Sequence, residues 1–155
     1  MAEFLSVERI DTDLQGGDKA DALRALAGLL AGAGPSGHDT AWPTSDEIHR
    51  ALLQREALGS TGVGDGVAIP HGRLPAIDCF AGALAIRRGG VPFEAVDGRP
   101  VSIMFALIGP ERAAGEHLKC LARISRVLRD PGVRERLRAA EGAGSARRIL
   151  IDADG

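Results

Sequence analysis

Residues 62–73 carry the short pattern from which the fold is best worked out, and they read G-V-G-D-G-V-A-I-P-H-G-R. Glycine allows close backbone approach and positive φ, and it recurs before and after the apolar run 67–69. Pro70 fixes its own φ and restricts the preceding Ile69 to an extended conformation. The pattern therefore predicts a strand over 67–69 that stops at Pro70, with His71 presented at the strand end.

His71 is the first candidate for chemistry. A neutral imidazole is a good nucleophile at cellular pH, and its unperturbed pKa lies in that range. A histidine between Pro70 and Gly72 is accessible from outside, as an in-line phosphoryl transfer requires. The alternative is that His71 is an ordinary loop histidine with no catalytic role.

On both sides of residues 62–73, hydrophobic periodicity predicts further helices and strands. Thr44 or Ser45 with Glu47 is typical of a capping box at the start of a helix. Helices are expected over 18–30, 46–57, 115–129, 133–140 and 145–151, and the run 32–37 ends the first of them. Strands are expected over 79–86, 91–93 and 100–108, with a turn at Gly89-Gly90 and an edge strand or N-terminal arm over 4–10. His38 and Trp42 are expected in a surface connection. Alternating strands and helices predict an α/β fold. We expect a single three-layer domain, residues 1–155, with a mixed central β-sheet flanked by helices on both sides.

Composition narrows the class of protein further. The 155 residues are 45% hydrophobic and 26% charged, as in an ordinary globular domain. No apolar run approaches ~20 residues and no signal peptide is apparent, so we expect no membrane insertion. The two cysteines, Cys79 and Cys120, are too few for a disulfide framework and suggest a reduced, cytoplasmic protein.

Charge is distributed unevenly along the chain. The net charge of −2 argues against general nucleic-acid binding. Residues 1–50 hold 9 acids and 4 bases, whereas residues 112–148 hold 4 acids and 10 bases. The basic region is either a solvated arginine-rich helix surface or a docking face for an acidic or phosphorylated partner.

Three motifs together resemble a known family. The central G-V-A-I-P-H-G-R is preceded by R-E-A-L-G-S-T-G at 55–62 and followed by G-E-H-L-K-C-L-A-R-I-S at 115–125. The chain, over a core of about 4–150, resembles the enzyme IIA domain of the phosphoenolpyruvate-dependent phosphotransferase system, mannitol/fructose type. The resemblance implies a phosphotransferase that takes a phosphoryl group on His71 from a phosphorylated histidine carrier protein.

The acceptor depends on the branch of that family. In a sugar branch the resemblance implies transfer to an enzyme IIB, during fructose or mannitol uptake. In the nitrogen-regulatory branch, phosphorylation controls binding to soluble regulatory proteins. The lead F-L-S-V-E-R-I-D-T-D-L-Q-G-G-D-K at 4–19 and the absence of a linker or second domain favour the regulatory branch.

Two further residues are expected at the site. His117 lies on the helical stripe shared by Leu121, Ile124 and Leu128, near a helix N-terminus that favours anions. Its alternative is a buried histidine of the core. The resemblance places Arg55 at the site, where a guanidinium matches phosphate oxygens. Arg73 is a rival that is closer in sequence to His71.

The same residues give less support to zinc binding or nucleotide binding. His71, His117 and Cys120 supply three zinc ligands, but no fourth has suitable spacing. The glycine run lacks the Gly-Lys-Ser/Thr ending of a Walker motif. We therefore expect neither metal nor cofactor. Glu116 as an acid/base, and Ser60 and Thr61 as extra donors, remain open, and Asp65 is expected to point away from a bound phosphate.

Overall fold

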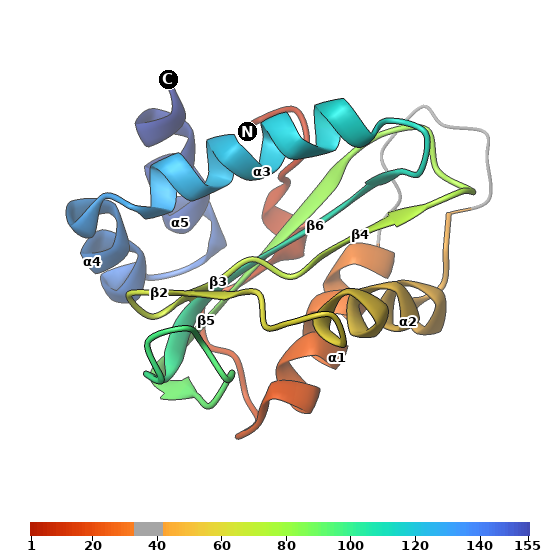
Figure 1. The fold of residues 1–155 in the computed structure, drawn as a ribbon. Helices are drawn as coiled ribbons and strands as arrows, with labels where there is room; N and C mark the ends of the chain where they lie inside the picture. The colour runs from red at the N-terminus through yellow and green to blue at the C-terminus, as the bar shows by residue number, and fades with distance from the viewer. Residues whose placement is uncertain (33–41) are drawn as a thin grey trace.

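The computed structural model describes residues 1–32 and 42–155, and within them six strands form one mixed sheet (Figure 1). The order is β1-β5-β6-β3-β2, with β4 also paired to β6. β6 runs parallel to β3 and β4 and antiparallel to β5. The strands are β1 Ile10–Asp11, β2 Gly62–Gly64, β3 Val67–Ala68, β4 His71–Leu74, β5 Ala81–Val91 and β6 Val101–Pro110.

Helices cover both faces of this sheet, as the sequence predicts (Figure 1). Side chains of β6 alternate between two cores: Met104, Ala106 and Ile108 face α1 and α2, whereas Ile103, Phe105 and Leu107 face α3, α4 and α5. The helices are α1 Lys19–Ala31, α2 Ser45–Glu56, α3 Ala114–Leu128, α4 Pro131–Ala139 and α5 Ala143–Asp154, with a 3-10 helix η1 at Val7–Arg9. The predicted three-layer α/β domain is confirmed.

Side chains cap the N-termini of α1 and α2. The Asp18 side chain accepts from the Asp21 amide at the start of α1. Thr44 and Glu47 form the expected capping box of α2. The run 33–37 and His38 lie outside the described residues. Trp42 is half-buried rather than on the surface, because its Nε1 donates to the Leu30 carbonyl at 2.8 Å.

The chain around His71 differs from the prediction. The predicted strand does stop before Pro70: β3 ends at Ala68, and Ile69 and Pro70 separate it from β4. The Pro70 carbonyl still accepts from the Leu107 amide of β6 at 3.0 Å. Proline removes a donor but keeps its acceptor, so the neighbouring strand still holds the chain extended. His71 therefore opens β4, in register with Leu107, instead of ending a strand.

The predicted turn at Gly89-Gly90 is wrong, and the glycine-rich residues 62–66 form regular structure. Gly89-Gly90 is no turn between strands: β5 continues through it to Val91, and the pairing with β6 shifts register between Ile86 and Val91. Residues 62–66 make up most of a hairpin, in which Asp65 and Gly66 form the turn with positive φ. None of the helices in the described part of the chain is both long and apolar enough to cross a membrane.

Candidate functional site

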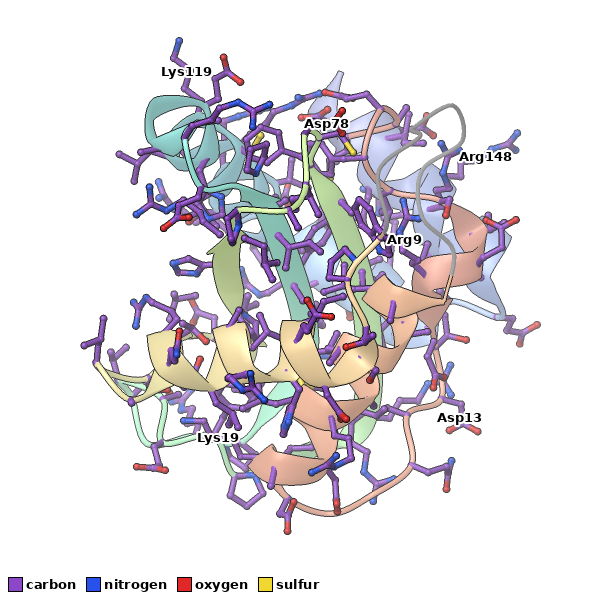
Figure 2. The ribbon with its side chains drawn as sticks, turned by 90° about the vertical axis from the view of Figure 1, so that its right-hand side faces the viewer. Arg9, Asp13, Lys19, Asp78, Lys119 and Arg148 are labelled. Carbon is purple, nitrogen blue, oxygen red and sulfur yellow. The ribbon has the colours of Figure 1, made fainter. Side chains whose placement is uncertain are left out.

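The three predicted site residues meet at one cleft. His71 opens β4, Arg55 lies in the last turn of α2, and His117 lies in the first turn of α3. Figure 2 shows α2 and α3 on opposite sides of the strands, with Lys119 of α3 at the top. The cleft between them has a volume of about 430 Å³ and is lined by all three residues. The sheet thus brings together residues from three separate segments.

Two hydrogen bonds define the state of the His71 ring. Nδ1 lies 2.8 Å from the Ile69 carbonyl oxygen, which can only accept, so Nδ1 carries the proton. Nε2 accepts from Nε of Arg55 at 3.2 Å. Burial lowers the pKa of His71 below 6.5, opposed by the Ile69 bond and assisted by the Arg55 charge. At neutral pH, His71 is therefore a neutral imidazole with the lone pair on Nε2.

Arg55 is held in place by the end of its own helix. Its Nη1 donates to the Gly59 carbonyl at 2.8 Å, just past the C-terminus of α2. This second bond fixes the guanidinium while Nε faces His71. A planar fork with further N–H groups beside a nucleophilic nitrogen is suited to phosphate oxygens.

His117 is a buried polar side chain without a partner. It is 4% exposed, and neither ring nitrogen has a hydrogen bond among the described residues. Its ring centroid lies 5.6 Å from that of His71 and 5.9 Å from that of Phe80. Burial, and then the charges of His71 and Arg73, lower the pKa of His117 to about 4. Buried polar groups are nearly always hydrogen-bonded, so His117 has capacity for a ligand in the cleft.

Positive potential surrounds the cleft on two further sides. Ala114, the first residue of α3, lines it, and the N-cap residue Ala113 offers no side-chain cap to the free amides of the first turn. Arg73 also lines the cleft, and its Nη1 donates to the Glu111 carbonyl at 3.2 Å. Arg73 is exposed at the rim, whereas Arg55 contacts His71 directly.

Comparisons with known proteins show the family of the chain. A family model described as "Phosphoenolpyruvate-dependent sugar phosphotransferase system, EIIA 2" matches residues 3–153. The chain belongs to this family. Nitrogen regulatory proteins of Bradyrhizobium diazoefficiens and Pseudomonas aeruginosa are 38% and 36% identical to it, over 97% and 98% of this chain and 94% and 95% of theirs. The crystal structure of nitrogen regulatory protein IIA-Ntr from Neisseria meningitidis superposes with a TM-score of 0.85 at 36% identity, covering 96% of this chain and 97% of that one.

Several residues weighed for an enzyme IIA site lie elsewhere. The Ser60 hydroxyl donates to the Phe93 carbonyl, and the Thr61 hydroxyl bonds to Glu56, so both support the chain after α2. Asp65 and Glu116 line other hollows of the surface. These side chains are not among those that line the His71 cleft.

A zinc site would require His71, His117 and Cys120 to lie together. Cys120 lines a different hollow, beside Cys79. Within residues 1–32 and 42–155, no group of three or more histidine, cysteine or acidic side chains is arranged to hold a metal ion. The geometry in this family member favours an anion over a cation at the cleft.

Three contributions to the site were not found from sequence. The Ile69 carbonyl sets the His71 tautomer, and a backbone acceptor leaves no mark in a sequence. The Phe80 ring packs beside His117 and next to Gly109. A side chain at position 109 would leave no room for it, because a Cβ at Gly109 would lie 2.3 Å from the Phe80 ring. Leu58 and Leu118, 85% and 67% exposed, line the cleft. Leu58 lies in the turn after α2 and Leu118 on α3, and their apolar character at these positions was the available signal.

Proposed function

We propose that the chain is a nitrogen-regulatory enzyme IIA that accepts a phosphoryl group on Nε2 of His71, and that its phosphorylation state controls partner binding. The observation that carries the proposal is the pair of hydrogen bonds on the His71 ring. They leave the lone pair on the nitrogen that faces an arginine and an open cleft. No base has to remove a proton before attack.

The transfer conserves atoms and electrons without an added reactant. The Nε2 lone pair attacks phosphorus, and the P–N bond in the phosphorylated histidine of the donor carrier breaks, returning its electron pair to the donor ring. The His71 ring becomes positive as the new P–N bond forms, and the Ile69 carbonyl, 2.8 Å from Nδ1, stabilises that charge. The Nε–H of Arg55, which donates to His71 Nε2 before the transfer, then donates to a phosphoryl oxygen instead.

His117 and the first turn of α3 stabilise the remaining oxygens. The unpartnered ring of His117 is neutral, and its N–H donates to a phosphoryl oxygen on the side opposite Arg55. Free amides at the helix N-terminus, next to Ala114, add positive potential. His117 thus acts on the phosphoryl group without being phosphorylated.

The rim of the cleft is suited to protein partners. Exposed Leu58 and Leu118 offer apolar contacts on either side of His71, and Arg73 adds a charge. Partner proteins commonly use such an apolar centre with a polar rim. The donor, a phosphorylated histidine carrier protein, and the acceptor or target bind here in turn.

The names of the relatives favour the regulatory branch over sugar uptake. The two relatives and the crystal structure described above are all nitrogen regulatory proteins, and they match this chain almost end to end. We therefore prefer soluble regulatory proteins over an enzyme IIB as the target. Transfer to an enzyme IIB in fructose or mannitol uptake is the alternative.

A capture experiment tests this function. The immobilised chain is phosphorylated with phosphoenolpyruvate, enzyme I and the histidine carrier, and bound regulatory proteins are quantified by mass spectrometry against the unphosphorylated chain. Phosphorylation should change the amount of a captured regulator at least tenfold, and His71→Ala should abolish the difference. His49→Ala, on α2 outside the cleft, should behave as the unchanged chain. Equal capture in both states, with sugar uptake lost in a deletion strain, would favour the alternative.

A further inference from the structure

A second hollow, the arginine pocket, lies at the opposite end of β6 from His71. It has a volume of about 440 Å³, within the range of small-molecule sites. Arg88 of β5, Arg99 before β6, and Arg134 and Arg138 of α4 line it, together with Ser102 near the start of β6. His71 pairs with Leu107, toward the other end of β6.

The arginine pocket carries an uncompensated positive charge. Four guanidinium groups line it against a single carboxylate, that of Asp65. Within the described part of the chain, none of the four arginines forms an ion pair with an acidic side chain. Four like charges around one hollow repel one another unless an anion lies between them.

Backbone carbonyls hold these guanidinium groups in place without neutralising them. Arg88 donates from Nε to the Arg138 carbonyl at 2.7 Å and from Nη2 to the Ala140 carbonyl at 2.9 Å. Arg134 donates from Nη1 to the carbonyls of Leu128 and Arg129. Each guanidinium has five N–H groups, so both keep donors for a ligand.

Arg138 is positioned by the hairpin turn and by β6. Its Nε donates to the Ser102 hydroxyl at 2.8 Å and its Nη2 to the Asp65 carbonyl at 3.2 Å. A Cβ at Gly66 would lie 2.8 Å from that Nη2, so glycine is what allows the guanidinium this close to the turn. Arg99 is exposed, and its side chain makes no hydrogen bond among the described residues and only a charge interaction with the neighbouring Asp97, so its N–H groups remain available to a ligand.

The lining indicates the chemical class of the ligand. Arginine forks match the oxygens of phosphate, and several forks around one hollow require an anion with several charges on a compact frame. No aromatic side chain lines the pocket within residues 1–32 and 42–155, so no ring is present on which a base would stack. The pocket therefore selects linked phosphate groups rather than a base.

We propose that the arginine pocket binds the diphosphate group of a small oligophosphate, either free inorganic diphosphate or the diphosphate of a nucleotide. The site is separate from the His71 cleft, with which it shares no lining residue. Its occupancy accordingly does not depend on phosphorylation of His71. This gives a binding role to part of the basic 112–148 region, through Arg134 and Arg138.

The test is an NMR titration of the full chain with inorganic diphosphate and, separately, with ADP. Amide shifts should concentrate at Gly66, Gly89 and Ser102. The Arg99 side chain makes no hydrogen bond and interacts only through its charge with the exposed Asp97, so Arg99→Gln keeps the fold, and diphosphate affinity should fall about tenfold. Arg148→Gln makes the same charge change on α5, outside the arginine pocket (Figure 2), and should leave affinity within twofold.

Each outcome decides for or against the proposal. Equal affinity for diphosphate and ADP would show that the diphosphate group alone accounts for binding. Tighter binding of ADP would show that the natural ligand is a nucleotide. Either result supports the proposed site. The proposal is overturned if millimolar diphosphate does not bind, or if shifts are confined to Gly72 and Ala114 at the His71 cleft. Citrate binding as tightly as diphosphate, or equal losses in Arg99→Gln and Arg148→Gln, would also overturn it.

Discussion

At the scale of single residues, the account depends on which nitrogen of His71 carries the proton. The Ile69 carbonyl and Arg55 Nε select a neutral ring with a free pair on Nε2. Burial lowers the pKa of this ring below 6.5, and that of His117 to about 4. Near neutral pH both rings are neutral, and a pH change that affects the nucleophile acts through His71.

The rate of phosphorylation should therefore report the titration of His71. Above its pKa the ring is neutral and the rate is constant; as pH falls through the pKa, which lies below 6.5, Nε2 gains a proton and the rate falls. His117→Gln should lower the rate about a hundredfold without moving this midpoint, because it removes a donor to the phosphoryl group but not the nucleophile.

The measurement is single-turnover labelling by the phosphorylated carrier between pH 5 and 8, compared with the His71 ring titration followed by NMR. Carrier-only and Arg148→Gln series serve as controls for the donor and for net charge. A midpoint above pH 7, or one that moves with His117→Gln, would contradict the assignment of roles.

At the scale of elements, the account rests on helix ends that position side chains. Thr44 and Glu47 cap α2, with Thr44 Oγ1 accepting from the Glu47 amide at 3.2 Å. Thr44→Ala should lower the free energy of unfolding by ~1 kcal/mol, measured by urea denaturation. Ser45→Ala, one residue further on, should cost less than half as much. Phosphorylation should be kept, because Arg55 lies at the other end of α2; equal losses of stability in the two variants would refute the cap's role.

The helices were predictable because periodicity and capping are local properties. The errors in strands are of another kind: His71 is predicted at a strand end and Gly89-Gly90 as a turn, yet His71 opens β4 and β5 continues through Gly89-Gly90. There the neighbouring strand β6 supplies partners that local sequence does not reveal, as the Leu107 amide does for Pro70. Residue types at the site were predictable from motifs, whereas their contacts required the fold.

At the scale of the whole molecule, the sheet separates two hollows with different linings. One end of β6 supports the His71 cleft between α2 and α3, and the other end supports the arginine pocket beneath α4. The layered core holds α2 and α3 on opposite faces of the sheet, so Arg55 and His117 approach His71 from two sides (Figure 1). The two hollows share no lining residue.

The central claim is that His71 receives the phosphoryl group through Nε2. The most direct measurement is heteronuclear 31P and 15N NMR of the chain after incubation with phosphoenolpyruvate, enzyme I and the histidine carrier. The account predicts one phosphorylated nitrogen, Nε2 of His71, with the Nδ1 of that ring still facing the Ile69 carbonyl. Phosphorus on His117, or on Nδ1 of His71, would contradict it.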